Sequence, residues 1–173
     1  MRTMPWVERR FVFNTPASLF PPFLERLRGS PVRVEERVRN LAPEVLRRRE
    51  ESAWSIQENI GHLLDIETLW HGRLDDYESG CQVLRAADME NRRTHDANHN
   101  SRALQEILAS FRTSRMKLVE RLEGLDEAGV ERSAMHPRLG QPMRIMDMVV
   151  FAAEHDDHHL ARMTELIQAF AGG

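Results

Sequence analysis

Hydrophobic residues recur at spacings of three and four along four long segments of the chain, as expected for helices that each bury one face. The first segment covers residues 16–41 and is interrupted at residues 29–31, where Gly, Ser and Pro follow one another. This interruption predicts a kinked or broken helix. Pro43 suits the first position of a short helical turn that extends to Arg49.

The second segment has the clearest start signal. Ser55 and Glu58 have the spacing of a capping box, and apolar residues then follow at helical intervals, so a helix is expected from about Trp54 to Tyr77. A third helix is expected after Asn100 and Ser101, either of which can cap it, and it should end near residue 124.

A fourth helix is expected to open at Pro142 and to carry apolar positions from residue 143 to residue 170. Residues 78–100 are polar and irregular, which is long for a structureless connection, so this crossover should be partly ordered or functional and could shape a pocket. Strand signals are scarce. The pattern predicts an all-α fold, a four-helix bundle with one long crossover, in a single domain over residues 1–173.

Composition narrows the classes of partner. The chain has 24 basic and 27 acidic residues, a net charge of -3, so neither nucleic acid nor an anionic membrane is an expected partner. Cys81 is the only cysteine, which excludes an internal disulfide and a cysteine-based zinc cluster. With no signal-peptide pattern and no apolar stretch of about 20 residues, we expect a cytoplasmic protein.

Histidines supply the candidate chemistry. His155 and His159 are four residues apart in the last helix, so they share one face and can bind one metal ion. On a helical wheel His159 lies on the apolar face and His155 lies at its edge. His158 points about 140° away from Ile145, a residue of that face. His62 in the second helix is the natural third ligand, and His71 is a weaker candidate because it lies on the opposite side of that helix.

Two readings of this pattern stay open. Two histidines at this spacing on a charged helix are often solvated surface residues. Alternatively, three neutral imidazoles hold a divalent ion, with zinc or nickel expected, and leave a coordination position for a water or a thiolate. Asp156 and Glu58 are candidates to support the ligands, with Asp65 a further possibility, although the capping role is the better reading for Glu58.

Two stretches resemble the DinB/YfiT-like superfamily: WSIQENIGHLLDIETLWHGRL at Trp54–Leu74 and AEHDDHHLARM at Ala153–Met163. The resemblance implies a four-helix bundle in which His62, His155 and His159 bind a divalent metal. Arg162 stands where many members have glutamine, three residues after the last ligand. The resemblance also implies a homodimer.

The resemblance leaves several functions open. The leading one is a metal-dependent transferase that uses a low-molecular-weight thiol in stress response or detoxification. Anionic thiols would favour a basic pocket, to which Arg85, Arg92 and Arg93 of the crossover could contribute. The alternatives are a metal-dependent hydrolase that activates a bound water, or a non-catalytic bundle that binds a metal or a small ligand.

Overall fold

Four long helices form the bundle in the computed structural model, which describes residues 3–171. They are α1 (Phe20–Val38), α3 (Ile56–Glu78), α5 (Leu104–Glu123) and α7 (Ile145–Ala171). Both α1 and α3 pack against α5 and α7, so α1 and α3 occupy opposite corners of the bundle. The predicted four-helix bundle is confirmed for the described residues. The outermost positions of the predicted domain, residues 1–2 and 172–173, lie outside them.

Short elements lie at the ends of the bundle and along its side. The helices among them are α2 (Pro43–Arg47), α4 (Arg92–Asp96) and α6 (Glu127–Val130), with 3-10 turns at Trp6–Glu8, Ala17–Leu19 and His99–Ser101. A two-stranded antiparallel hairpin, β1 (Ser133–His136) and β2 (Gln141–Arg144), precedes α7. The all-α prediction is therefore right for the architecture, but it missed this hairpin.

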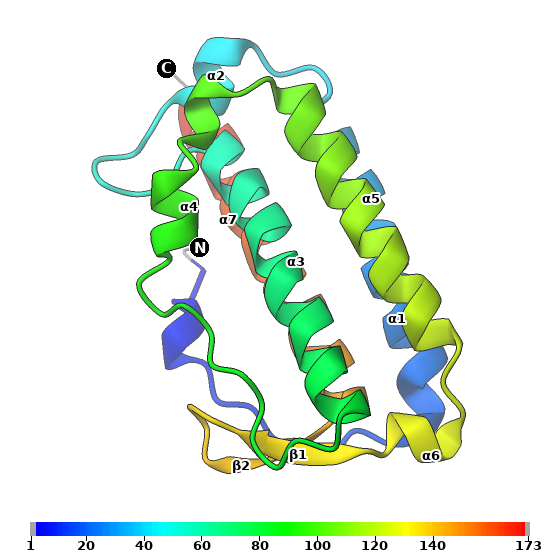
Figure 1. Ribbon diagram of the computed structural model, residues 1–173. Coiled ribbons are helices and arrows are strands. Elements are labelled where there is room, and N and C mark those ends of the chain that lie inside the picture. The colour runs from blue at the N-terminus through cyan, green and yellow to red at the C-terminus, as the bar shows by residue number, and fades with distance from the viewer. Residues whose placement is uncertain (1–2, 172–173) are drawn as a thin grey trace.

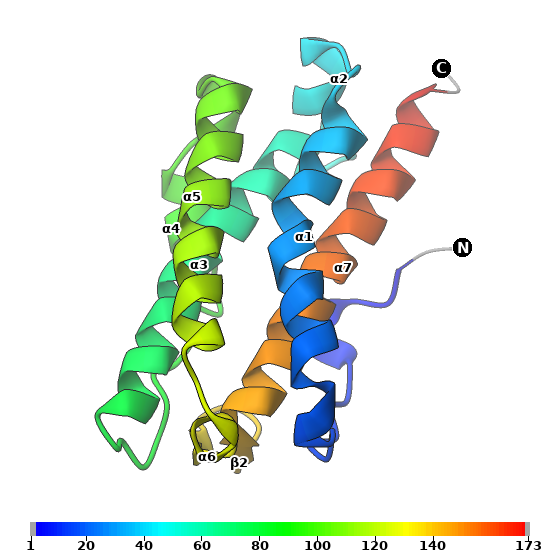
Figure 2. The same cartoon turned by 90° about the vertical axis from the view of Figure 1, so that its right-hand side faces the viewer.

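The order of the helices requires the long crossover. Figure 1 shows that α3 and α5 run in the same direction, so the chain must return along the whole bundle between them. Figure 2 shows α1 and α7 running the opposite way. The crossover carries α4 and one 3-10 turn, so it is partly ordered, as expected.

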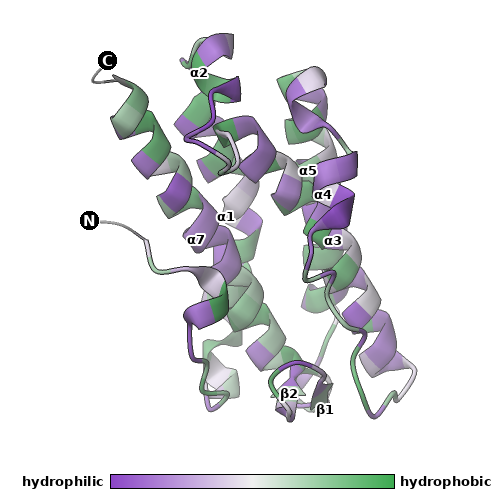
Figure 3. Cartoon of the chain, turned by 90° about the vertical axis from the view of Figure 1, so that its left-hand side faces the viewer, coloured by the Kyte–Doolittle hydropathy of each residue, from purple (hydrophilic) through white to green (hydrophobic). Residues whose placement is uncertain are grey.

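A polar layer divides the hydrophobic core into two parts. Green and purple residues alternate along the helices in Figure 3, the pattern of amphipathic helices. One apolar cluster includes Leu27, Trp70 and Leu118, and the other includes Val34 and Phe111. Charged residues that are almost fully buried lie between the two in sequence and in the bundle: Glu67, Arg115 and Asp156.

These three charged residues form one ion-pair cluster. Arg115 donates to Glu67 Oε1 from Nη2 at 2.6 Å and from Nε at 3.0 Å. It also donates to both carboxylate oxygens of Asp156. Asp156 faces inward, but its partner is the Arg115 guanidinium rather than one of the candidate ligands, which corrects the expected supporting role of this residue. The reason is that α5 places Arg115 at the same level of the bundle.

The first helix is not broken at residues 29–31. Helix α1 continues through Pro31, although proline has no N–H for the carbonyl of Leu27 one turn earlier. Arg115 Nη1 donates to that carbonyl at 3.4 Å, so the buried cluster satisfies the acceptor that Pro31 leaves free.

Three helix starts can be compared with their predictions. The capping box at Ser55 and Glu58 is present, and α3 begins at Ile56. Helix α5 begins at Leu104, two or three residues later than expected, because Ser101 lies in a 3-10 turn. Helix α7 begins at Ile145 rather than at residue 142, because residues 141–144 pair with β1, and the Asp147 carboxylate accepts the backbone N–H of residue 144.

Candidate metal centre

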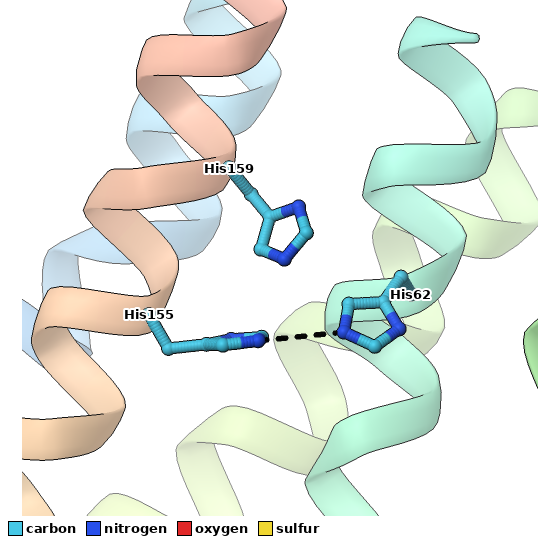
Figure 4. Close-up of side chains that lie close together, drawn as sticks. All are labelled: His62, His155 and His159. Atoms are coloured by element: carbon cyan, nitrogen blue, oxygen red, sulfur yellow. Dashed lines mark hydrogen bonds between the residues drawn. The ribbon is translucent and has the colours of Figure 1, made fainter. Parts of the chain in front are cut away.

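Three imidazoles from two helices converge inside the bundle. His62 comes from α3 and His155 and His159 come from successive turns of α7, and Figure 4 shows the rings directed toward one another. One ring nitrogen from each lies within 4.8 Å of the others, and the Nε2 atoms of His62 and His155 are 3.4 Å apart. All three side chains are buried. The structure thus brings together the three candidate ligands named from the sequence, and excludes the solvated surface reading for them.

Neighbouring polar groups fix two of the rings. Nδ1 of His159 lies 2.9 Å from Asn59 Oδ1, and the amide nitrogen of Asn59 donates to the Ser55 carbonyl at 2.8 Å. Because this leaves Oδ1 as an acceptor, Nδ1 of His159 must carry the proton and Nε2 the lone pair. Nδ1 of His62 is hydrogen-bonded to the Thr94 hydroxyl at 3.1 Å. Both rings therefore have a supported Nδ1 and an Nε2 directed at the other imidazoles.

Burial keeps the three imidazoles neutral. It lowers the pKa of His62 to about 4, with smaller contributions from nearby histidines and an opposing one from Asp65. Burial and the neighbouring imidazoles also lower the pKa values of His155 and His159 well below the ordinary range. Neutral imidazoles are the form that binds metals.

The donor set fits a divalent ion. Zn–N bonds of about 2.0–2.1 Å at tetrahedral angles separate two ligand nitrogens by about 3.3 Å, close to the spacing between the His62 and His155 nitrogens. Nδ1 of His155 is buried and has no hydrogen-bond partner among residues 3–171. Imidazole nitrogens alone suit several transition metals, so the three histidines could hold a divalent ion without identifying it.

The other residues named from the sequence lie elsewhere or have other partners. His158 is half-buried and outside the three-nitrogen group, and His71 is hydrogen-bonded to the carbonyl of residue 114. Glu58 completes the capping box and pairs with an arginine of the preceding loop. Asp65 accepts from Nε2 of His99 at 2.8 Å rather than from His62.

A large cavity opens over the triad. Its volume is about 1090 Å³, and its walls come from α3, α7, the crossover, the hairpin turn and the N-terminal segment. The ring of Trp6 lies 5.0 Å from that of His155, and the ring of Trp54 lies 4.7 Å from that of His62. Two indoles therefore flank the imidazoles and restrict access of water to them.

The arginines of the cavity differ from those expected. Arg85, Arg92 and Arg93 of the crossover pair with carboxylates and do not line it. Those that do are Arg73, Arg138 and Arg162. Arg162, at the position where the superfamily often has glutamine, pairs with Glu50 and Glu165.

Sequence reasoning missed the groups that orient the rings. Asn59 lies one turn before His62 on α3, and a buried amide one turn from a candidate ligand was a usable signal. Thr94 belongs to the crossover, so its contact with His62 depends on the tertiary fold. Gly61 was also informative, because a Cβ there would lie 2.2 Å from the His99 ring that packs against it.

The fold and the three histidines define this protein as a four-helix bundle with a candidate metal centre between two of its helices. Its sequence matches the DinB superfamily over residues 26–163, and the chain belongs to that family. The same fold is found in the solved structure described as "YfiT from Bacillus subtilis is a probable metal-dependent hydrolase with an unusual four-helix bundle topology". The two chains are 16% identical, with a TM-score of 0.84 over 95% of this chain and 94% of that one.

A comparison with curated proteins found no match to this sequence. Within residues 3–171, no helix combines the length and the apolar character needed to cross a bilayer.

Proposed function

We propose that this protein is a metal-dependent enzyme, best described as a hydrolase of a small molecule, in which His62, His155 and His159 bind a zinc or nickel ion. The observation that carries the proposal is the convergence of three neutral, buried imidazoles on one point at the wall of a large cavity. The description of YfiT as a metal-dependent hydrolase supports the same reaction class.

A divalent ion at this position supplies a Lewis acid that polarises a substrate or lowers the pKa of a coordinated water or thiol. The protein's own groups perform the remaining tasks. Asn59 fixes the tautomer and orientation of His159, and the Thr94 hydroxyl holds the orientation of His62. Trp6 and Trp54 flank the imidazoles and restrict the access of bulk water.

A thiol S-transferase is the second candidate, because the same three ligands leave room for a thiol. The crossover arginines, which were expected to make the pocket basic, do not support this candidate, because their side chains lie outside the cavity. A different arginine, Arg73, lines the cavity and would suit an anionic thiol.

Metal content of protein purified without a histidine tag tests the site directly, by elemental mass spectrometry. We expect about one equivalent of metal in the native chain and none in a His155→Ala, His159→Ala double variant. His71→Ala is the matched control, because His71 lies on α3 outside the cavity, and it should retain the metal. Absence of metal from the native chain, even after incubation with zinc or nickel, would contradict the proposal.

Turnover distinguishes the reaction classes once metal is bound. A panel of chromogenic esters, amides and phosphoesters tests hydrolysis, and low-molecular-weight thiols with a chromogenic electrophile test transfer. Metal-dependent turnover in the first panel supports the hydrolase, and turnover only in the second supports the transferase. Stable metal binding with no turnover in either would indicate the non-catalytic bundle.

A homodimer stays a prediction, which light scattering can check.

A further inference from the structure

Arg73 is the one fully buried cationic side chain on the cavity wall among the described residues. Its exposed fraction is 1%, and it lies on the same side of α3 as His62 and Trp70. Arginine is rarely buried unless a carboxylate or another acceptor compensates its charge. The partners of this guanidinium therefore indicate whether it has a structural role or an unfilled binding role.

Among the described residues no carboxylate is hydrogen-bonded to Arg73, although the nearby charge of Asp76 compensates part of its own. Its Nε donates to the backbone carbonyl of Arg85 at 3.3 Å. Within residues 3–171, no acceptor bonds to its terminal nitrogens, and its Nη1 atom is fully buried. The face of Trp70 lies 5.8 Å from the guanidinium carbon, which offsets only part of the cost of burial. Burial accordingly lowers the pKa of Arg73 to about 10, which still leaves it charged at neutral pH.

The natural intrahelical partner of Arg73 is bound to another residue. Asp76 lies three residues later on α3, but its carboxylate accepts the backbone N–H and three side-chain hydrogen bonds of Arg85. Gly72 makes this possible, because a Cβ there would lie 1.9 Å from Nη1 of Arg85. The close approach of Arg85 to α3 thus occupies the hydrogen-bonding positions of Asp76, which interacts with Arg73 only through its charge.

A neutral hydrogen-bond donor accompanies this guanidinium in the cavity wall. Nδ1 of His136 lies 3.3 Å and 3.2 Å from the backbone nitrogens of Arg138 and Leu139, which donate to it. In the neutral ring, Nε2 therefore carries the proton and is a donor. Burial lowers the pKa of His136 to about 4, with smaller contributions from the charges of Arg73 and Arg138, and all three side chains line the cavity.

We propose that Arg73, with His136 and Arg138 beside it, binds the oxyanion group of the substrate, a carboxylate or a phosphate. The inference rests on the proposed function, because it assigns this end of the cavity to substrate bound at the histidine centre. A planar guanidinium with free N–H groups matches either oxyanion.

The spacing suits one small molecule that reaches both ends. Trp70 lies between them: its ring is 5.8 Å from the Arg73 guanidinium carbon and 6.0 Å from the His155 ring. The aromatic walls of the cavity suit an apolar body between the anionic group and the reacting group. Among the lining residues these walls include Trp6, Trp54, Trp70 and Phe151.

Binding of simple probes tests the inference without requiring activity. Benzoate, phenyl phosphate and the neutral isostere benzamide are titrated into the full-length protein, both loaded with zinc and freed of metal by chelation, and followed by NMR of the indole N–H signals. We expect benzoate or phenyl phosphate to bind about ten- to hundredfold more tightly than benzamide in both samples. The tighter of the two probes identifies the oxyanion.

Variants test whether Arg73 is the residue that binds the anionic probes. Arg73→Met should abolish the preference for the anion, and Arg73→Lys, which keeps the charge but not the planar fork, should reduce it by a smaller factor. Arg92→Met is the matched control, since Arg92 is exposed and lies outside the cavity, and it should bind the probes as the native protein does. Circular dichroism checks that each variant is folded, and Arg73→Lys carries the test if Arg73→Met does not fold.

Two outcomes would overturn the inference. One is an equal affinity for benzamide and the anions, or a preference that survives both Arg73 variants. The other is a preference seen only in the zinc-loaded sample, which would place the anion on the ion. Measurement of metal content tests the metal proposal separately. If that proposal failed, the binding result in the metal-free sample would still stand.

Discussion

Two buried polar clusters lie side by side on α7, and they differ in how their polar atoms are satisfied. Asp156 belongs to the ion-pair cluster, in which Arg115 is bonded to two carboxylates and to a backbone carbonyl. His155, its neighbour in sequence, belongs to the histidine triad, which contains no carboxylate and whose nitrogens face one another. The first cluster is closed within the protein, and the second opens on a cavity.

The difference separates a structural role from a binding role. A buried charge with opposite charges bonded to it can be stable without any ligand. Neutral imidazoles with facing nitrogens are stabilised by binding a cation, and none of the described residues provides one. The same reasoning sets Arg73 apart from Arg115, because both are buried guanidiniums and only Arg115 is bonded to carboxylates.

The largest expected effect comes from opening the closed cluster. Arg115→Met leaves Glu67 and Asp156 buried without a cation, and the free energy of unfolding should fall by about 3–5 kcal/mol in urea titrations. Removing all three charges, by adding Glu67→Leu and Asp156→Leu, should recover most of that loss. A loss below about 1 kcal/mol for Arg115→Met would contradict a structural role for the cluster.

Metal binding by the histidine triad should stabilise the folded protein. At a free zinc concentration of 100 times its Kd, the free energy of unfolding should rise by about 2.7 kcal/mol, because the ion binds the folded state. The His155→Ala, His159→Ala variant should show no such rise, and His71→Ala should show it in full. Thermal unfolding with and without zinc measures the difference. An equal rise in the double variant would place the ion elsewhere.

A pH dependence follows from His136, a buried imidazole whose Nδ1 is held by backbone donors. Its pKa of about 4 in the folded state is below its ordinary value, so the unfolded chain takes up a proton first as the pH falls. The contribution of His136 to stability should therefore decrease from about pH 6.5 to about pH 4, by up to about 1.4 kcal/mol per pH unit. The buried histidines of the triad add a decrease of the same sign. His136→Asn, which can still accept from the backbone, keeps that shared part, so its stability should fall less than that of the native protein when unfolding is measured across that range.

Glu67 does not obscure that comparison. Burial and, to a smaller extent, Asp156 raise the pKa of Glu67 to about 7, so its contribution to stability increases as the pH falls. The native protein and the His136→Asn variant share this contribution, and it cancels in the difference between them. Identical pH profiles for the two proteins would show that His136 is not held neutral.

The smallest expected effect comes from a group that orients the triad. Thr94→Val removes the hydroxyl bonded to Nδ1 of His62 while it keeps the side-chain shape, and zinc affinity should fall by about tenfold. Competition with a chelating dye measures the affinity. Thr68→Val is the control, because the Thr68 hydroxyl donates to a carbonyl of α3 outside the cavity, and its zinc affinity should match that of the native protein.

Much of the fold could be predicted because it depends on local pattern. Four apolar stripes gave four long helices, and the spacing of His155 and His159 together with the inward side of α3 gave the three histidines that the structure brings together. The capping box at Ser55 is equally local. These features depend on residues within one or two helical turns of one another.

The rest depends on contacts between distant segments. The strands of the hairpin have four residues each, too few to show an alternating pattern. The sequence made Asp156 a candidate to support the metal ligands, but it could not identify Arg115 on another helix as its partner. The role of Arg73 could not be predicted from the sequence, because only the approach of Arg85 over Gly72 shows that Asp76 is not hydrogen-bonded to it.

The neighbouring positions of His155 and Asp156 have a mechanical consequence for α7. Asp156 is tied through Arg115 to α5 and through Glu67 to α3, so the helix cannot turn about its own axis without breaking ion pairs. A rotation of about 10° would move an atom about 6 Å from that axis by roughly 1 Å, enough to disturb coordination by His155 and His159. The ion-pair cluster therefore fixes the rotation of α7 about its axis, and with it the directions of the imidazoles next to Asp156.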